Sequence, residues 1–159
     1  VPNQQIEPMV PWLVENIGPR CYIMGSDYVW PRTSARYIQE AFERAGGEVV
    51  NTEFFPFGIQ DLGPAFESVN AANVDMVWSM LAGADGVTML NQYNSFGLEP
   101  RLVGQGWDEV YSLRDVERID HETLSLALAL TMAGMNGRYS DAQWRKAAAA
   151  AEKAVRTIS

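Results

Sequence analysis

Two hydrophobic patterns alternate along the first hundred residues. Short runs rich in apolar residues stand at 20–26, 48–55, 74–81 and 101–106, and runs of this length are typical of strands buried in a sheet. Between these runs, apolar residues recur every three or four positions, which is the period of a helix that buries one face. The pattern therefore predicts that strands and helices follow one another in turn.

Proline and glycine help to place the ends of the helices. The first helix puts Met9, Trp12 and Leu13 on one stripe, and its Pro8 and Pro11 are expected to be tolerated only near its start. In the second, Pro31 suits a first helical turn, and two glycines follow the last apolar position. The predicted helices cover about 6–17, 31–47, 61–73 and 85–97.

Strands that alternate with helices predict a parallel sheet, because parallel neighbours need a crossover connection. The predicted fold class is therefore α/β, a three-layer arrangement of about four parallel strands with helices on both faces. We expect residues 1–106 to form this domain. Residues 107–159, with the alanine run "KAAAAAEKAV", are predicted to be a mostly helical tail that packs on the same domain.

The net charge of the chain limits the classes of partner that it can bind. The 159 residues have a formal net charge of −8 and are 47% apolar, which fits one domain with a real core. Residues 1–100 hold 4 basic and 12 acidic side chains, whereas residues 101–159 hold 8 of each. A negative surface repels polyanions, so we expect no nucleic-acid partner. The change in balance indicates a discontinuity near residue 100.

Several chemistries lack the residues that they need. Cys21 and His121 are the only cysteine and the only histidine, so a disulfide framework, a cysteine metal cluster, a His-based triad and a two-His metal site are not supported. Cys21 is best interpreted as a buried small hydrophobe. No apolar run reaches the ~20 residues of a membrane span, and no secretion signal is recognisable. We predict no catalytic set, metal, cofactor or membrane insertion.

Candidate binding residues follow the predicted strands. Ligands of open parallel sheets bind at the carboxyl ends of the strands, which directs attention to loops at 25–31, 55–61, 82–86 and 104–107. In the first loop, aromatic rings can wall a pocket while polar groups orient a ligand. Equally, these rings can cap the sheet edge or pack on a neighbour. The candidates in this loop are Ser26, Asp27, Tyr28 and Trp30.

The third loop, "LAGADGV", offers a weaker signal. Its backbone N–H groups at a helix start can hold a carboxylate or a carbonyl oxygen, although a plain tight turn is the favoured alternative. Asp85 can meet Asp27 at this edge and accept from an amide, but a helix cap is again favoured. The candidates here are Ala82, Gly83, Ala84 and Asp85.

Several motifs in order resemble one protein family. These are "PNQQ" at 2–5, "GSDYVWPR" at 25–32, "GGEVV" at 46–50, "DLGPAF" at 61–66, "NVDMVWSMLAG" at 73–83 and "LNQYNSFGL" at 90–98. Together they resemble the C-terminal lobe of a type I periplasmic solute-binding protein. The similar branch includes the amide and urea receptors of ABC transporters and the amide-sensing negative regulator.

The resemblance implies a binding role for both loops. In that family a small ligand is trapped in the cleft between two lobes, and the aromatics of the first loop, here Tyr28 and Trp30, contact it. Trp30 stands where relatives commonly carry tyrosine. The third loop would face the same cleft through Ala82, Gly83 and Ala84, although relatives often have an acidic or hydroxyl residue where Ala84 stands.

The same resemblance implies partners and a compartment. The partners would be a small polar ligand, a missing N-terminal lobe or a second copy of the chain, and a transporter permease. The compartment would be the periplasm, or the cytoplasm for the regulator branch. After residue 100 the similarity fades. To explain the missing first lobe, we expect an excised lobe, a natural truncated homologue, or an engineered or recombined chain.

Three function classes remain from the sequence. The favoured hypothesis is a non-enzymatic domain that binds a short amide, urea or an amino acid. The second is a truncated or engineered lobe that acts as a self-associating structural module. The third is a small α/β hydrolase, which would need Ser26, Asp27 and Asp85 to cluster.

Overall fold

The order of elements in the chain matches the predicted alternation. The computed structural model describes residues 2–106, so the predicted tail at 107–159, with its place on the domain, lies outside the described residues. The helices are α1 (Pro2–Asn16), α2 (Val29–Arg44), α3 (Gly63–Ala72) and α4 (Ala84–Phe96). The strands are β1 (Arg20–Ser26), β2 (Glu48–Phe55), β3 (Met76–Met80) and β4 (Arg101–Gly104).

The four described strands form one parallel sheet in the order β2-β1-β3-β4. In β1, Cys21 lies opposite Val49 of β2 on one side and opposite Met76 of β3 on the other. The chain first moves outward from β1 to β2, then returns to the far side of β1 to form β3 and β4. The direction of winding therefore reverses between β1 and β3, and such a reversal leaves a crevice at the carboxyl ends of the two strands.

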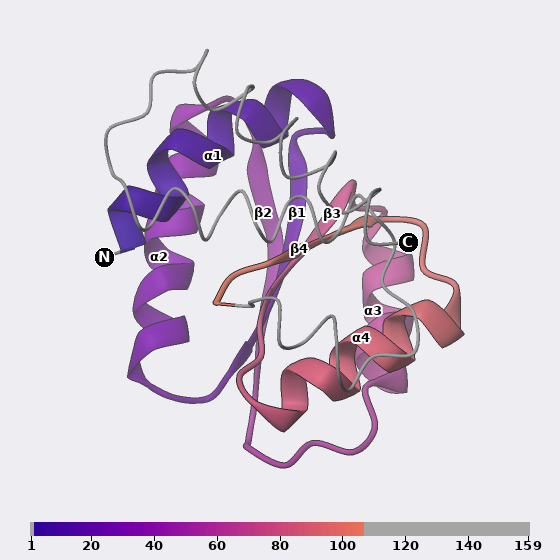
Figure 1. Ribbon diagram of the computed structural model, residues 1–159. Helices are drawn as coiled ribbons and strands as arrows, with labels where there is room; N and C mark the ends of the chain where they lie inside the picture. The colour runs from indigo at the N-terminus through magenta and orange to yellow at the C-terminus, as the bar shows by residue number, and fades with distance from the viewer. Residues whose placement is uncertain (1, 107–159) are drawn as a thin grey trace, which may run out of the picture.

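Helices cover both faces of the sheet (Figure 1). One hydrophobic cluster joins α1 and α2 to the sheet, and a second joins α3 and α4 to its opposite face. Side chains of β1 alternate between them: Cys21 and Ile23 enter the first cluster, whereas Tyr22 and Met24 enter the second. All five residues of β3 are buried. The three-layer α/β fold predicted from the sequence is confirmed, as is the burial of Cys21.

The start of α1 differs from the prediction. The helix begins at Pro2, and Pro8 and Pro11 lie inside it. Each proline lacks the N–H that would donate to the carbonyl one turn earlier, so the expectation that both would stand near the helix start was wrong. The helix tolerates the loss because its buried face packs in the first cluster through Ile6, Met9, Val10 and Leu13.

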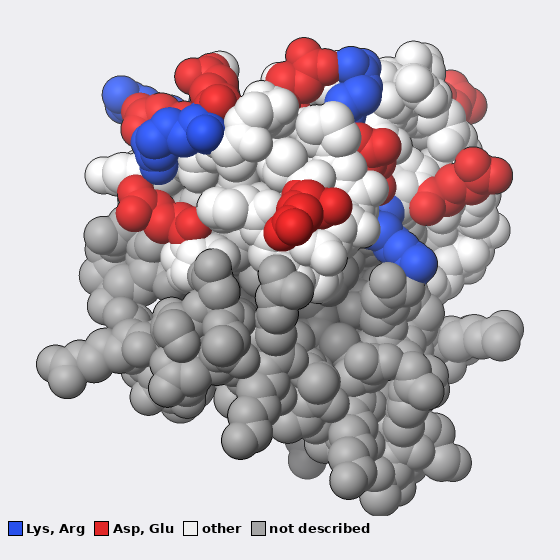
Figure 2. All heavy atoms as spheres, turned by 90° about the horizontal axis from the view of Figure 1, so that it is seen from above, with Lys and Arg blue, Asp and Glu red and all other residues white. Residues whose placement is uncertain are grey.

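Charged side chains are mixed rather than gathered on the described surface seen in Figure 2, where acidic groups lie beside the basic ones. This distribution fits the excess of acidic residues in the first hundred positions. Within residues 2–106, no helix combines the length and the apolar character needed to cross a membrane.

Candidate ligand-binding site

The loops that follow β1, β2 and β3 are joined to one another at the carboxyl edge, the edge at which the strands end. Ser26 closes β1 and is fully buried, and its Oγ accepts a hydrogen bond from the backbone N–H of Ala82 at 3.0 Å. The N–H of Asp27 donates to the carbonyl of Phe55 at 2.7 Å. Ser26 therefore fixes the positions of the loops on both sides of the crevice between β1 and β3.

Three aromatic rings stand side by side at this edge. The ring centroids of Tyr28 and Trp30 are 6.5 Å apart with planes at 23°, and those of Tyr28 and Phe57 are 5.5 Å apart with planes at 32°. Tyr28 and Trp30 are half-buried, whereas Phe57 is 62% exposed. We call Tyr28, Trp30 and Phe57 the aromatic wall. The rings thus pack on one another, as one of the two interpretations expected, and they also leave apolar surface exposed.

The aromatic wall reaches from the loop after β2 to the segment after β4. A Cβ placed on Gly106 would lie 3.6 Å from Cη2 of Trp30. Trp30 also packs against the α1 and α2 core cluster, so its ring is supported from behind. The wall therefore crosses the whole described carboxyl edge and rests on the core.

Asp27 and Arg32 form an exposed ion pair beside the wall. The Arg32 Nε donates to Oδ1 of Asp27 at 2.6 Å, and the guanidinium carbon lies 4.4 Å from the ring centroid of Phe54. The hydrogen bond from Arg32 lowers the pKa of Asp27. Asp27 thus has a local partner in Arg32, whereas Asp85 bonds to a different loop.

Asp85 holds the loop that carries Phe57. It is only 3% exposed, and its two carboxylate oxygens both lie 3.1 Å from the backbone N–H of Gly58, which donates to them. The N-cap of α4 is Gly83 and makes no side-chain cap. The expectation that Asp85 caps its own helix was wrong, because the carboxylate reaches across to a different loop.

The loop after β3 is a tight turn, which was the favoured alternative. The N–H of Asp85 donates to the carbonyl of Ala82 at 3.2 Å, and the N–H of Gly86 donates to that of Gly83 at 3.1 Å. Ala82 is half-buried, whereas Gly83 and Ala84 are exposed. The backbone of Gly83 and Ala84 is therefore the exposed part of this turn.

A buried amide fixes the segment after β4. The side chain of Gln105 accepts from Nε1 of Trp78 at 3.0 Å and donates to Oε1 of Gln5 in α1 at 2.9 Å. Its backbone N–H donates to the carbonyl of Ser79 at 2.9 Å. These bonds hold Gly106 at the edge of the aromatic wall.

Sequence reasoning missed Phe57 and Gln105. Phe57 lies in a loop that the topology argument had selected, and an aromatic residue just before a glycine in such a loop is the same kind of signal that drew attention to Tyr28. Gln105 carried no comparable signal, since its importance depends on Trp78 and Gln5, which are distant in sequence.

Ser26, Asp27 and Asp85 do not form a catalytic group. Each has its own partner: the N–H of Ala82, the guanidinium of Arg32 and the N–H of Gly58. Among residues 2–106, no group of three or more His, Cys, Asp and Glu side chains is placed to hold a metal ion. The geometry favours binding through apolar surface and backbone groups over a carboxylate hydrolase.

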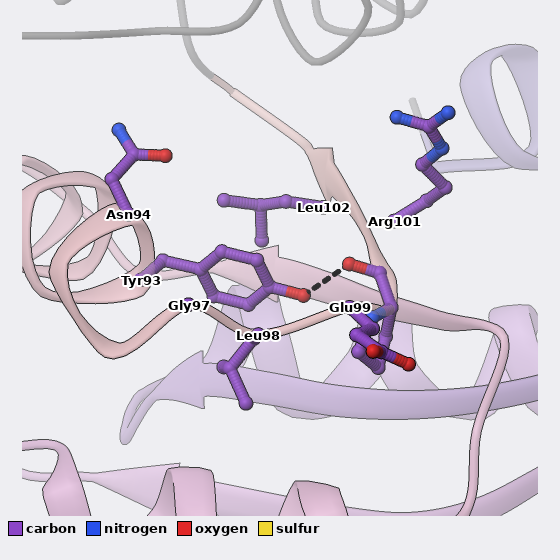
Figure 3. Close-up of a pocket in the computed structure, with 8 residues that line it drawn as sticks. Tyr93, Asn94, Gly97, Leu98, Glu99, Arg101 and Leu102 are labelled. Carbon is purple, nitrogen blue, oxygen red and sulfur yellow. Dashed lines mark hydrogen bonds between the residues drawn. The ribbon is translucent and has the colours of Figure 1, made fainter.

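A separate pocket of about 140 Å³ lies where α4 ends and β4 begins, at the opposite edge of the sheet (Figure 3). Its lining includes Gly97, Leu98 and Glu99, and the hydroxyl of Tyr93 donates to the carbonyl of Pro100 across it. None of the predicted site residues lies there. We therefore place the candidate site at the carboxyl edge.

A parallel α/β sheet whose strand order reverses, with connected loops at the reversal, is a doubly wound fold, in which ligands bind at the carboxyl ends of the strands. Residues 1–125 match the family model described as a periplasmic binding protein domain. The chain belongs to this family.

Solved structures of solute-binding proteins share the fold. An ABC transporter substrate-binding protein from Sphaerobacter thermophilus is 29% identical, with a TM-score of 0.61, and the match covers 67% of this chain and 30% of that one. A branched chain amino acid ABC transporter periplasmic ligand-binding protein from Burkholderia xenovorans is 19% identical, with a TM-score of 0.64 and coverages of 98% and 46%. This chain thus spans less than half the length of either protein.

A third structure was solved with a ligand. It is the solute binding protein of an ABC transporter from R. palustris in complex with 4-hydroxybenzoate, which is 19% identical, with a TM-score of 0.60 and coverages of 98% and 47%. At 19% identity, the Burkholderia and R. palustris proteins support the fold and no more.

Proposed function

We propose that this protein is a non-catalytic ligand-binding domain of an ABC-transporter solute-binding system. Membership of the periplasmic binding protein domain family supports the proposal, as do the similar solute-binding proteins. The observation that carries it is the aromatic wall at the strand reversal, where Ser26 joins the loops after β1 and β3. By family, the place of work would be the periplasm.

The ligand we propose is a small polar molecule that carries an amide, urea or amino-acid group. Tyr28 and Trp30 would supply stacking and shape, and the exposed backbone of Gly83 and Ala84 would supply hydrogen bonds. Ser26 and Asp85 are buried and bonded within the domain. Their proposed role is to position the loops, while the hydrogen bond from Arg32 orients Asp27.

The described carboxyl edge would form one side of a cleft. The exposed Phe57 and the 77% exposed Val29 give this edge an apolar surface that favours burial against a partner. The opposite side would come from an N-terminal lobe or from a second copy of the chain. Closure of such a cleft around a ligand would present it to a transporter permease.

A ligand titration of the 159-residue protein tests this proposal. Urea, acetamide and leucine would each be titrated while protein NMR shifts are recorded, because this readout detects weak binding. We expect at least one ligand to bind, with the affinity lost in Tyr28→Ala and kept in Tyr37→Ala, which truncates an exposed tyrosine on α2. Binding that survives Tyr28→Ala unchanged would contradict the proposed site.

Self-association is the second candidate function, and the exposed apolar rings favour it. Thermal unfolding at two protein concentrations separates the two roles, because a partner that binds only the folded state raises its stability by mass action. A midpoint that rises with concentration and ignores every ligand would favour a structural module. A midpoint that rises with ligand alone would favour a receptor domain.

A further inference from the structure

The aromatic wall offers more ring surface than a molecule of the size of urea can cover. Its three rings lie in series, with Tyr28 between Trp30 and Phe57 at centroid distances of 6.5 and 5.5 Å. A compact amide covers the face of one such ring and leaves Phe57 in water. A planar ring in the ligand would bury surface on two neighbouring rings, and offset or tilted aromatic contacts at these separations are favourable.

The wall is held in place before any ligand arrives. Asp85 holds the backbone at Gly58 and therefore the neighbouring Phe57. Trp30 is followed by Pro31, and a Cβ on Gly25 would lie 3.0 Å from Cβ of Pro31, so the start of α2 is packed tightly on β1. A preformed surface loses little conformational entropy when a ligand binds.

The charged side chains beside the aromatic wall already have hydrogen-bond partners within the domain. Arg32 is paired with Asp27 and lies over the ring of Phe54, and the carboxylate of Asp85 is buried against the N–H of Gly58. Arg32 and Asp27 are therefore bonded to each other, and the carboxylate of Asp85 is turned inward to the backbone of Gly58. Such a surface suits the uncharged face of a ligand rather than its charged end.

Resting on the proposed function, we infer that the ligand carries an aromatic ring, which stacks against Tyr28 and Phe57, in addition to its amide or carboxylate group. The polar group then lies towards the exposed backbone at Gly83 and Ala84. Phe57 is the residue that separates this ligand class from short aliphatic amides.

Two carboxamides with the same number of carbon atoms test the inference. Benzamide and cyclohexanecarboxamide differ in the planarity and unsaturation of the ring, and acetamide lacks the ring. Each would be titrated into the 159-residue protein by NMR. We expect benzamide to bind at least about 10-fold more tightly than either of the other two, a ratio that corresponds to a few favourable ring contacts.

Variants then assign the effect to Phe57. Phe57→Leu keeps an apolar side chain but removes the ring, and we expect it to weaken benzamide about 5-fold or more while leaving cyclohexanecarboxamide unchanged. Phe96→Leu is the matched control, because Phe96 is a partly exposed phenylalanine that packs on Phe66 of α3. Circular dichroism would verify that both variants fold.

The outcomes separate this inference from the proposed function. If acetamide or cyclohexanecarboxamide binds as tightly as benzamide, or if Phe57→Leu weakens all three equally, the ring preference is wrong and the binding function stands. If no carboxamide binds and urea and leucine also fail, the proposed function itself is wrong.

Discussion

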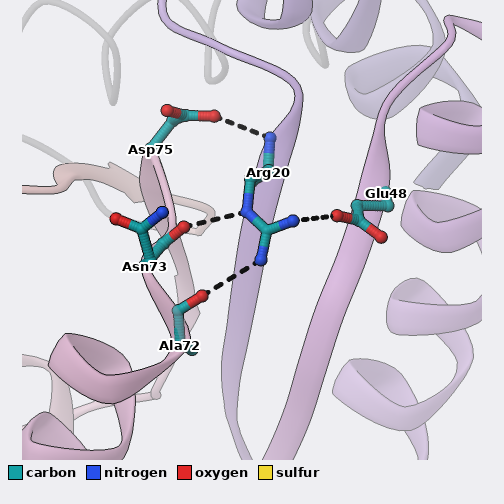
Figure 4. Close-up of polar contacts among 5 residues, drawn as sticks. All are labelled: Arg20, Glu48, Ala72, Asn73 and Asp75. Atoms are coloured by element: carbon teal, nitrogen blue, oxygen red, sulfur yellow. Dashed lines mark hydrogen bonds and ion pairs between the residues drawn. The ribbon is translucent and has the colours of Figure 1, made fainter.

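The two edges of the sheet differ in their contacts: polar groups are hydrogen-bonded at one edge, and aromatic rings are partly exposed at the other. At the amino edge, where the strands begin, Arg20 donates from Nε to the carbonyl of Asn73 at 2.8 Å and from Nη2 to that of Ala72 at 3.1 Å, and it pairs with Glu48 (Figure 4). Its backbone N–H donates to Asp75 at 2.8 Å. At the carboxyl edge, by contrast, Phe57 is exposed and Tyr28 and Trp30 are only half-buried.

This difference separates the contacts that stabilise the sheet from the surface that we propose binds a ligand. The contacts of Arg20 satisfy the last carbonyls of α3, which a helix leaves unpaired, so the amino edge is occupied with holding the fold together. The aromatic wall costs the isolated domain exposed apolar surface and brings it no comparable bond. The pocket near Gly97 in Figure 3 lies apart from the aromatic wall, so the candidate site rests on the exposed rings and not on that hollow.

The largest loss of stability is expected when a Cβ is added at Gly18. This residue has a φ of 151°, and a Cβ there would overlap the side chain of Asp75. Gly18→Ala should lower the free energy of unfolding by about 2–4 kcal/mol, measured by urea denaturation. Gly46→Ala is the control, because Gly46 has a φ of 81° but open space around it. Equal losses in the two variants would show that the contact with Asp75 is unimportant.

A pH effect is expected from Tyr22, whose hydroxyl donates to Glu53 and accepts from Asn51. Burial, and then the hydrogen bond to Glu53, raise the pKa of Tyr22 from 10.0 to about 12. The folded state holds this proton more tightly, so its contribution is complete below pH 10 and is lost as the pH rises through 12. The loss should be about 2 kcal/mol.

Unfolding of the wild type and Tyr22→Phe at about pH 9 and about pH 11.5, on either side of the ordinary tyrosine pKa, measures this contribution. The wild type should lose more stability than the variant between the two values, because phenylalanine does not titrate. Parallel losses would assign the alkaline sensitivity to other groups.

A loss of about 1–2 kcal/mol is expected from Asp85→Ala, which leaves the N–H of Gly58 without its carboxylate. We expect this substitution to lower both the stability and the ligand affinity, because the loop that carries Phe57 loses its hydrogen bond to Asp85. Benzamide affinity should fall although every ring remains in the sequence. An unchanged affinity would mean that Phe57 keeps its place without Asp85.

A loss of about 1 kcal/mol is expected from Arg20→Met, which removes the donors to α3 at a site that is 37% exposed. Ligand affinity should not change, because the substitution lies at the other edge. Arg44→Met serves as the control, since Arg44 is 57% exposed and pairs only at the surface with Glu7 and Glu40. A drop in affinity with Arg20→Met would show that the edges are coupled.

The smallest effect on stability is expected from Phe57→Ser. Because the ring is 62% exposed, the free energy of unfolding should stay within about 0.5 kcal/mol of the wild type. Self-association, followed by sedimentation at several concentrations, should decrease. A large loss of stability would show that Phe57 belongs to the core rather than to a binding surface.

The strands were the most predictable part of the molecule. The predicted ranges 20–26 and 48–55 agree with β1 and β2 residue for residue, because glycine or proline stands just before each apolar run. The start of α1 was not predictable in this way, since Pro8 and Pro11 are local signals that packing of the helix overrides. Local signals thus located the elements that are bounded by glycine or proline. They failed where tertiary contacts compensate for a proline inside a helix.

The sequence indicated which loops to inspect for the candidate site, but not how their side chains contact one another. Topology selected the loops, and composition selected Tyr28 and Trp30. That Asp85 would serve Gly58, and that Phe57 would join the aromatic wall, depends on how two loops meet across 27 residues of sequence. Such contacts have no periodic pattern, so they become visible only once the loops are placed in space.

The position of Cys21 has a practical consequence. It is the only cysteine of the chain, it is fully buried in β1 between β2 and β3, and burial raises the pKa of its thiol. The thiolate is the nucleophile that attacks an alkylating reagent, and it must be exposed to reach one, so modification must wait until the sheet opens. The rate at which Cys21 is labelled therefore reports how often the domain opens. Mass spectrometry can measure this rate in the unaltered protein, with and without ligand.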